Sequence, residues 1–256
     1  MQLNHDRRGS GEPLVLVHGI GSHWRAFEPV LDRLAREREV ISLDLPGFGE
    51  SEPLPDGTKP DVDALTTSVE RFIDGLGIGE PHVAGFSLGG RITLELAKRD
   101  RVRSATAICP AGFWLPRERK WSQAQLKLSL WGARALGDHI GPLLRYPVVR
   151  TLAMSNLVAQ PWRMTHEAVL SDMHALASAP GFDATLDAFS HEPFALDAPL
   201  RAPVTIAWGD RDQILLPRQA QRAMRITGAR RFVRLRRAGH VPFWDDPDGV
   251  VDAVLG

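Results

Sequence analysis

Cysteine is almost missing from this sequence, because Cys109 is the one cysteine among 256 residues. A single cysteine excludes an internal disulfide and a metal site built from several thiolates. Charge of one sign is missing as well, since 31 lysines and arginines balance 31 aspartates and glutamates. That balance gives no reason to expect nucleic acid or an anionic membrane as the main partner.

Long apolar runs are also lacking. None is long enough to span a bilayer, and the first residues, MQLNHDRRGSGEP, are polar and have no apolar stretch of a secretory signal. We therefore expect no membrane span and a cytoplasmic protein. The composition is 43% hydrophobic and 24% charged, which is ordinary for a globular fold. A chain of 256 residues allows one α/β domain, with or without an inserted subdomain.

Short apolar runs that end at glycine or proline alternate with segments of helical spacing in the first part of the chain. The run PLVLVHG, for example, suits a strand buried on both faces of a sheet. Strands are expected near 13–19, 39–45, 81–87 and 102–110, and helices over 24–37, 61–78 and 88–100. At most one short strand fits ahead of them, in residues 1–9. This alternation predicts a mostly parallel α/β sheet with right-handed crossovers.

The alternation stops in the middle of the chain. Residues 113–196 hold no convincing strand, and their apolar residues follow helical spacing. Strand patterns resume at 203–212 and at 230–240. We therefore predict a core formed by residues 1–112 and 197–256, with a helical cap, residues 113–196, inserted into it.

Ser87 lies in the motif GFSLG, between an expected strand and an expected helix. G-x-S-x-G in this context matches the nucleophile elbow, a sharp turn that exposes a serine hydroxyl. Such a turn strains the backbone, so Gly85, Gly89 and Gly90 leave space that bulkier residues would fill. The alternative is an ordinary serine that caps a helix. The strand before Ser87 and the helix after it favour the nucleophile.

Two backbone N–H groups near Ser87 could bind a developing oxyanion. In the elbow arrangement, one belongs to the residue after the nucleophile, here Leu88. The other comes from the loop after the first central strand, where the sequence HGIG points to Ile20. His18 in the same loop is interpreted as a structural residue that shapes the turn.

A base for Ser87 should be a histidine at the carboxyl edge of the sheet, where ligand sites of open α/β sheets lie. His240 meets that condition because it follows the last expected strand. The alternative is a loop histidine with no partner. An acid should orient the ring, and Asp210 and Asp212 both follow the preceding strand. Asp44 also ends a strand and is expected to hold the turn after it.

These pieces together resemble the α/β-hydrolase superfamily. The matching segments, between residues 14 and 247, are LVLVHGIGSHWRAFEPV, VISLDLPGFGES, HVAGFSLGG, VTIAWGDRDQILLP and AGHVPFWDDP. The resemblance implies an α/β-hydrolase fold with a helical cap between the sixth and seventh core strands. It implies a catalytic triad of Ser87, Asp212 and His240, in the chain order of that superfamily. It also selects Asp212 over Asp210 and assigns the oxyanion hole to Ile20 and Leu88.

The superfamily group that the sequence resembles covers several activities. It includes carboxylesterases, small lipases, C–C bond hydrolases of ring-cleavage products, cofactor-free haloperoxidases or perhydrolases, and serine lyases. Ser87 argues against epoxide hydrolases and haloalkane dehalogenases, which carry aspartate at this position. Phe86 stands where many ring-cleavage-product hydrolases carry asparagine, which counts toward an ester substrate.

We expect transfer of an acyl group to water, with no metal and no organic cofactor. The expected substrate is the ester of an uncharged, hydrophobic small molecule, and neither nucleic acid nor a membrane span is expected. The residues expected to line its pocket are Phe86, His23, Trp114, Trp131 and Val241. A charged acid would instead need an inward arginine, and the candidates are Arg134, Arg145, Arg150 and Arg163. C–C bond hydrolysis, perhydrolase chemistry and a non-catalytic ligand-binding role stay open, as does the oligomeric state.

Overall fold

The computed structural model describes residues 2–189 and 191–256, and a seven-stranded sheet runs through them. The strands are β1 His5–Arg8, β2 Pro13–Val17, β3 Glu39–Leu43, β4 His82–Phe86, β5 Ser104–Ile108, β6 Val204–Gly209 and β7 Arg231–Leu235. They lie side by side in the order β1-β3-β2-β4-β5-β6-β7. Only β1 runs antiparallel to its neighbour, so the mostly parallel sheet predicted from the sequence is confirmed.

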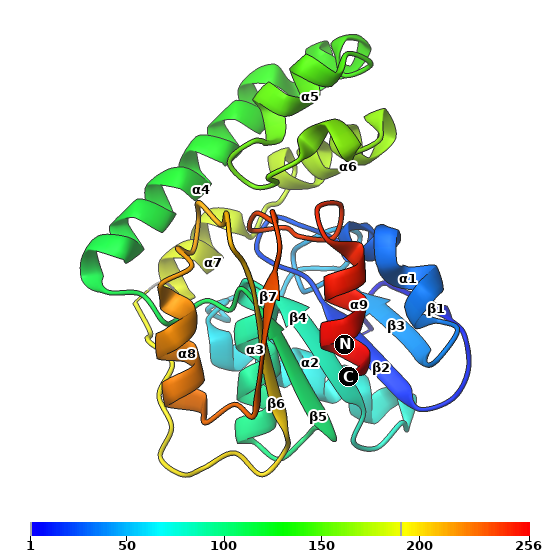
Figure 1. The fold of residues 1–256 in the computed structure, drawn as a ribbon, viewed down its shortest axis with the longest axis vertical. Helices are drawn as coiled ribbons and strands as arrows, with labels where there is room; N and C mark the ends of the chain where they lie inside the picture. Colours follow the sequence, from blue (N-terminus) through cyan, green and yellow to red (C-terminus); the bar gives the residue numbers. More distant parts are fainter. Residues whose placement is uncertain (1, 190) are drawn as a thin grey trace.

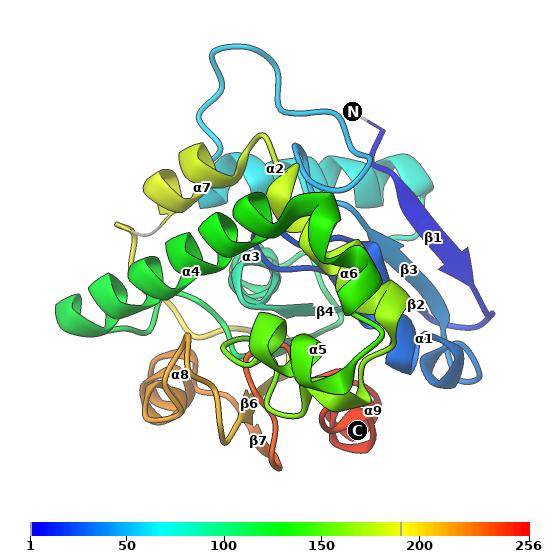
Figure 2. The same cartoon turned by 90° about the horizontal axis from the view of Figure 1, so that it is seen from above.

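The central strands are apolar without interruption because helices cover both faces of the sheet. In β2, β4 and β5 every residue after the first is buried. The covering helices are α1 Glu28–Leu34, α2 Val62–Leu76, α3 Leu88–Lys98, α8 Gln219–Thr227 and α9 Pro247–Leu255. Figures 1 and 2 show α1 and α9 on one face of the sheet and α2, α3 and α8 on the other.

Helix α2 shows why these helices begin and end where they do. Its first turn is capped by Asp61, whose carboxylate accepts a hydrogen bond from the Ala64 N–H at 2.9 Å. It ends at Gly77, which has a φ of 65°, a conformation that glycine adopts without strain. Leu65, Val69 and Phe72 lie along its buried side, as the spacing predicted.

The chain between β5 and β6 is helical throughout its described elements. These are α4 Pro116–Leu136, the 3-10 helix η2 Gly137–Leu143, α5 Pro147–Met154, the short 3-10 helix η3 Pro161–Arg163, α6 His166–Ala177 and α7 Phe182–Phe189. We call residues 113–196 the helical insert. In this chain's own numbering it follows the fifth strand and not the sixth, because one strand, β1, precedes β2. The domain boundaries at 112 and 197 stay a prediction.

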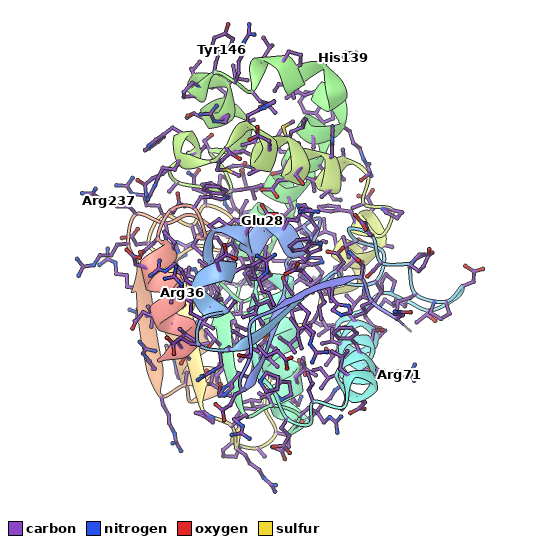
Figure 3. All side chains as sticks on the ribbon, turned by 90° about the vertical axis from the view of Figure 1, so that its right-hand side faces the viewer. Glu28, Arg36, Arg71, His139, Tyr146 and Arg237 are labelled. Atoms are coloured by element: carbon purple, nitrogen blue, oxygen red, sulfur yellow. The ribbon has the colours of Figure 1, made fainter. Side chains whose placement is uncertain are left out.

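The helical insert lies over one end of the sheet. Figure 1 shows α4, α5 and α6 above the core helices, and Figure 3 places His139 and Tyr146 at the tip farthest from the sheet. The insert has a small apolar cluster of its own, formed by Ile140, Leu144, Met154, Val158, Met164, Val169 and Met173. None of the described helices combines the length and the apolar character needed to cross a membrane.

Candidate active site

The site lies where the strand order reverses direction. From β2 the chain moves outward to β3, and it then returns to β4 on the other side of β2. Neighbouring strand ends at such a switch point leave a crevice in which ligands of α/β proteins bind. Gly19 and Ile20 follow β2 there, and Ser87 follows β4.

Ser87 occupies a sharp turn between β4 and α3. Its φ of 57° and ψ of −117° are unusual for a residue with a side chain. The turn is held by the Ser87 N–H, which donates to the Ile108 carbonyl at 3.0 Å. A Cβ on Gly85 would collide with the Gly89 carbonyl, and one on Gly89 would collide with the carbonyls of Val17 and His18. The Ser87 side chain makes no capping bond to α3, so the reading of an ordinary helix cap is not supported.

His240 and Asp212 form a buried pair beside this turn. His240 Nδ1 lies 2.8 Å from Asp212 Oδ2, and both side chains are almost fully buried. The other carboxylate oxygen of Asp212 accepts the N–H groups of Ile214 and Leu215, each at 2.8 Å. Because a carboxylate accepts at Nδ1, that nitrogen carries the proton and Nε2 keeps its lone pair. Nε2 is buried and has no hydrogen-bond partner among the described residues.

Asp210, the other acid considered from the sequence, points elsewhere. It pairs with Arg234 at 3.2 Å on the outer side of the sheet edge. Of the two aspartates after β6, Asp212 is therefore the one in contact with His240.

Cys109 joins the pair to form the one cluster of potential metal ligands in the described part of the chain. Ligand atoms of Cys109, Asp212 and His240 lie within 4.8 Å of one another. Metals bind the thiolate form of cysteine. Burial, with the nearby charge of Asp212, raises the pKa of the Cys109 thiol well above its usual value. Both oxygens of Asp212 are also engaged, so these groups are poorly suited to a metal ion.

The loop after β2 passes close to Ser87. A Cβ on Gly19 would lie 3.0 Å from the Ser87 Cβ, which shows how tightly the two turns approach. The N–H groups of Ile20 and Leu88 donate no hydrogen bond within the part of the chain that the structure describes. Leu88 is the first residue of α3, where N–H groups are free and the helix dipole favours negative charge.

His18 has the structural role expected from the sequence. Its Nε2 accepts the Leu45 N–H at 2.9 Å, so the proton lies on Nδ1, which donates to the Gly19 carbonyl at 2.7 Å. Complete burial lowers the pKa of His18 to about 4, in favour of the neutral ring that this pattern needs. Asp44 holds the next turn, since its carboxylate accepts the N–H groups of Trp24 at 2.7 Å and Glu50 at 3.0 Å.

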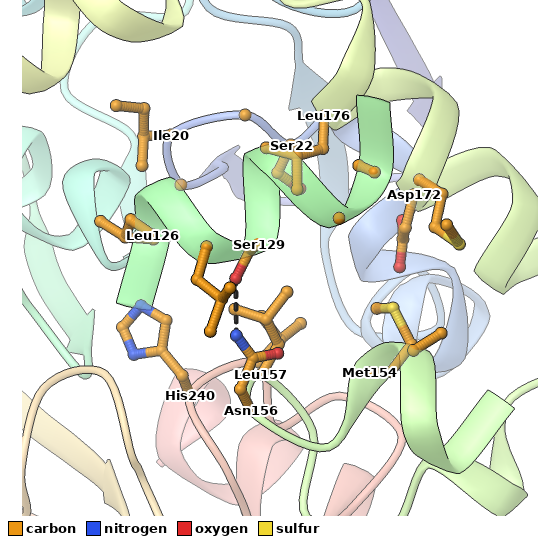
Figure 4. Close-up of a pocket in the computed structure, with 18 of the residues that line it drawn as sticks. Ile20, Ser22, Leu126, Ser129, Met154, Asn156, Leu157, Asp172, Leu176 and His240 are labelled. Atoms are coloured by element: carbon orange, nitrogen blue, oxygen red, sulfur yellow. Dashed lines mark hydrogen bonds between the residues drawn. The ribbon is translucent and has the colours of Figure 1, made fainter. Parts of the chain in front are cut away.

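Ser87 and His240 both face a cavity of about 340 Å³ between the sheet and the helical insert. Figure 4 shows His240 at one end of it and Asp172 toward the other. Three of the five residues expected to line the pocket do so: Phe86, Trp131 and Val241. The insert adds mostly apolar residues, among them Leu126, Met154, Leu157, Met173 and Leu176.

The other two pocket residues expected from the sequence, His23 and Trp114, lie elsewhere. His23 is outside the cavity wall, and its Nε2 lies 3.1 Å from Asp172 Oδ1. The carboxylate of Asp172 therefore stands at the wall in its place. Trp114 lines a separate space of about 10 Å³ on another side of Ser87. Sequence spacing could not reveal on which side of the serine each ring would fall.

None of the four candidate arginines lines the cavity, because each guanidinium is engaged at the surface. Arg150 donates to the Leu144 carbonyl at 2.7 Å and Arg163 to the Asp245 carbonyl at 2.6 Å. Arg134 lies 3.6 Å from Asp183, and Arg145 stacks on the ring of Tyr146. Asp172 is the acidic residue among the described residues of the cavity wall.

Asp245 is a site residue that the sequence did not reveal. Its carboxylate accepts three backbone N–H groups, from Gly239 at 2.8 Å, Ala159 at 2.9 Å and Gln160 at 2.7 Å. It thus ties the loop that carries His240 to the helical insert. An aspartate in a loop has no periodicity, so only its place just after His240 could have drawn attention to it.

Known proteins resemble this chain in sequence and in fold. The pimeloyl-(acyl-carrier protein) methyl ester esterase of a Shewanella species is 28% identical over 263 residues, or 99% of this chain and 93% of that protein. An acetyltransferase component of the acetoin cleaving system of Pseudomonas putida is 44% identical over 108 residues, but the match spans only 40% of this chain and 28% of that protein. The solved structure of a thermophilic esterase from Thermogutta terrifontis superposes with a TM-score of 0.76 at 23% identity, covering 98% of this chain and 91% of that one.

The last comparison is with whole families. The family described as "Alpha/beta hydrolase family" matches this chain over residues 14–253, which include Ser87, Asp212 and His240. The proteins that match this chain in sequence include a lipase and an esterase. The chain therefore belongs to the alpha/beta hydrolase family.

Proposed function

We propose that this protein is a carboxylesterase that cleaves an ester of an uncharged, hydrophobic small molecule through an acyl-Ser87 intermediate. The observation that carries the proposal is the shared cavity. Ser87 stands on its strained turn at one wall, and the unpartnered Nε2 of His240 is buried at the same site. The hydrogen bond from His240 to Asp212 leaves that nitrogen free to accept a proton.

The proposed reaction follows from these roles. His240 Nε2 takes the hydroxyl proton of Ser87 as Oγ attacks the ester carbonyl carbon. Asp212 holds the ring and stabilises its positive charge, and the N–H groups of Ile20 and Leu88 bind the oxyanion. The proton then passes from His240 to the alcohol that leaves. Water attacks the acyl-serine with His240 again as base, which releases the acid and restores Ser87.

The wall of the cavity supports an uncharged substrate. Apolar residues, among them several leucines, two methionines and Phe86, make up most of it, and burying such surface against an apolar acyl chain yields about 25 cal/mol per Å². The carboxylate of Asp172 would repel an acid group on the substrate. This argues for an ester over the vinylogous diketone acid that a C–C bond hydrolase would take, because none of the described arginines lines the wall to receive that carboxylate.

The test is a panel of p-nitrophenyl esters of rising chain length, measured beside ring-cleavage products and a peracid assay with hydrogen peroxide. We expect the highest kcat/KM on a neutral ester and loss of turnover in Ser87→Ala. Asp212→Asn should lower kcat about a thousand-fold or more, since an amide cannot accept from both His240 and the Ile214 and Leu215 N–H groups.

Matched controls make the test specific. Asp210→Asn changes the neighbouring aspartate, and Ser129→Ala removes another hydroxyl from the cavity wall; both should keep most of the activity. A fluorophosphonate should label Ser87 and no other residue. Ester turnover that persists in Ser87→Ala would reject the mechanism, and a much higher kcat/KM on ring-cleavage products would reject the ester assignment.

A further inference from the structure

Several large apolar side chains of the helical insert are exposed between α4 and α5. Leu152 is 78% exposed, Trp131 68% and Val148 64%, values that are unusual for such residues in one small region. We call the exposed large apolar residues between positions 128 and 152, on α4, η2, α5 and the turn before α5, the apolar rim: Leu128, Trp131, Leu136, Leu143, Tyr146, Val148 and Leu152. Figure 3 shows Tyr146 of this set at the tip of the molecule.

The apolar rim continues into the cavity of Ser87. Leu128, Trp131, Leu136 and Leu152 belong to the rim and also line the cavity wall. An apolar path thus leads from the outer surface of α4 and α5 to the proposed nucleophile. Leu143, Tyr146 and Val148 lie outside the cavity, so their exposure has no explanation in substrate packing.

The segment that carries the apolar rim has a positive net charge, although the chain as a whole is neutral. Residues 127–152 hold four basic residues, Lys127, Arg134, Arg145 and Arg150, against one acidic residue, Asp138. Among the described side chains, Arg134 is the one of these four that approaches a carboxylate, that of Asp183 at 3.6 Å. Within residues 127–152 the basic residues therefore outnumber the acidic ones by three, which the balance of the whole sequence conceals.

We propose that the apolar rim docks on the surface of a bilayer that contains anionic phospholipids. Helices that lie at a membrane surface carry leucine and tryptophan on one side and lysine and arginine around them. The apolar side chains enter the acyl region, and each basic residue gains about 1 kcal/mol near an anionic surface. Docking itself does not need catalysis. Its consequence, that an ester dissolved in the bilayer reaches Ser87 through the rim, rests on the proposed function.

A second copy of the chain fits this surface less well. A two-fold dimer would place each rim against the same rim, so the four basic residues of one copy would meet those of the other. An acidic protein would satisfy the charge, but stable protein interfaces need a matched shape around their apolar centre. Protruding side chains such as Trp131 and Leu152 enter a fluid hydrocarbon layer without such a match.

The experiment measures co-sedimentation of the Ser87→Ala protein with sucrose-loaded vesicles, so that no product forms. Vesicles of phosphatidylcholine with phosphatidylglycerol should bind the protein, and vesicles of phosphatidylcholine alone should bind it at least about tenfold more weakly. Added salt should weaken the binding, because it screens the charges of the rim.

Variants outside the cavity locate the contact. The pair Leu143→Ser and Val148→Ser should reduce vesicle binding about tenfold or more, and Arg145→Gln about fivefold. Phe232→Ser on β7 and Arg71→Gln on α2 are matched controls, exposed and remote from the rim, and should bind normally. In proteins that retain Ser87, the rim changes should leave turnover of the water-soluble p-nitrophenyl acetate unchanged.

Two results would overturn the docking proposal. One is the absence of binding to the anionic vesicles, and the other is an equal loss of binding in the rim variants and in the controls. Light scattering adds an alternative outcome: a dimer that the rim variants dissociate, without vesicle binding, would assign the rim to a second copy. Each of these results leaves the ester assays unaffected, so the docking and the proposed reaction fail independently.

Discussion

At the scale of single residues, the candidate site depends on hydrogen bonds between segments that lie far apart in the chain, such as those of His240 with Asp212 and of Asp245 with Ala159. Ser87, Asp212 and His240 could be selected because each follows an expected strand. Their approach could not be derived, since it depends on the loop 236–245 and its ties to the helical insert. For the same reason the sequence missed Asp245, whose three hydrogen bonds join segments far apart in the chain.

His18 gives a prediction about stability and pH. Its pKa in the folded chain, about 4, lies below the ordinary value of 6.5. Between these values the unfolded chain binds a proton that the folded chain does not, so acid favours unfolding. The stability that the lowered pKa of His18 gives the folded chain is complete above about pH 6.5 and is lost as the pH falls toward 4. From pH 7 to pH 5, this group should lower the free energy of unfolding by about 2 kcal/mol.

Urea unfolding at the two pH values measures this effect. His18→Gln keeps a donor and an acceptor but cannot titrate, so its loss of stability on acidification should be smaller by about 2 kcal/mol. His166→Gln, at a partly exposed position on α6, is the control and should follow the unchanged protein. Equal slopes for all three proteins would show that His18 does not bind the extra proton on unfolding.

At the scale of elements, strands were easier to predict than the orientation of helices. The buried runs of β2, β4 and β5 follow directly from their apolar sequences. The strand pattern at 230–240 is longer than the strand itself, because β7 ends at Leu235 and the positive φ of Arg237 turns the chain before His240. For α4, helical spacing identified an apolar face but not what covers it, so Trp131 lines the pocket as expected and is at the same time largely exposed.

Helix α6 places the carboxylate of Asp172 at the cavity wall. Under the proposed function, this negative charge disfavours substrates that carry an acid group. Asp172→Asn removes that charge from the cavity wall but keeps an oxygen that can accept from His23. We expect the kcat/KM for a monoester of a dicarboxylic acid to rise about tenfold relative to that for a neutral ester of equal length.

Both substrates are measured in each protein, because a general loss of activity does not change the ratio of the two kcat/KM values. Asp183→Asn on α7 removes a charge from the insert at a position outside the cavity, and should leave the ratio unchanged. A ratio that stays the same in Asp172→Asn would show that this carboxylate does not face the bound acyl group.

At the scale of the whole molecule, two apolar clusters of unequal size hold the structure together. The larger surrounds the sheet and includes residues from β2, β4 and β5 and the helices on both faces. The smaller lies inside the helical insert and is rich in methionine, a flexible residue. Composition gave the total apolar content but not this division, because the division depends on which helices the topology places against the sheet.

This division predicts that the insert opens more easily than the core. Backbone amides of α5 and α6 should exchange with deuterium faster than those of β2, β4 and β5, since fewer buried contacts must be broken. Leu144 is fully buried in the smaller cluster, and Leu144→Ala should cost about 2–5 kcal/mol there. Its effect should be confined to faster exchange in α5 and α6.

Leu16→Ala is the matched change in the larger cluster, because Leu16 is buried to the same degree in β2. It should accelerate exchange throughout the chain, including the insert, which depends on the sheet for its position. If Leu144→Ala accelerated exchange in β2, β4 and β5 as much as in α5 and α6, the insert and the core would unfold as one cooperative unit. A confined effect would instead mean that the wall of the cavity can open while the hydrogen bond between His240 and Asp212 stays in place.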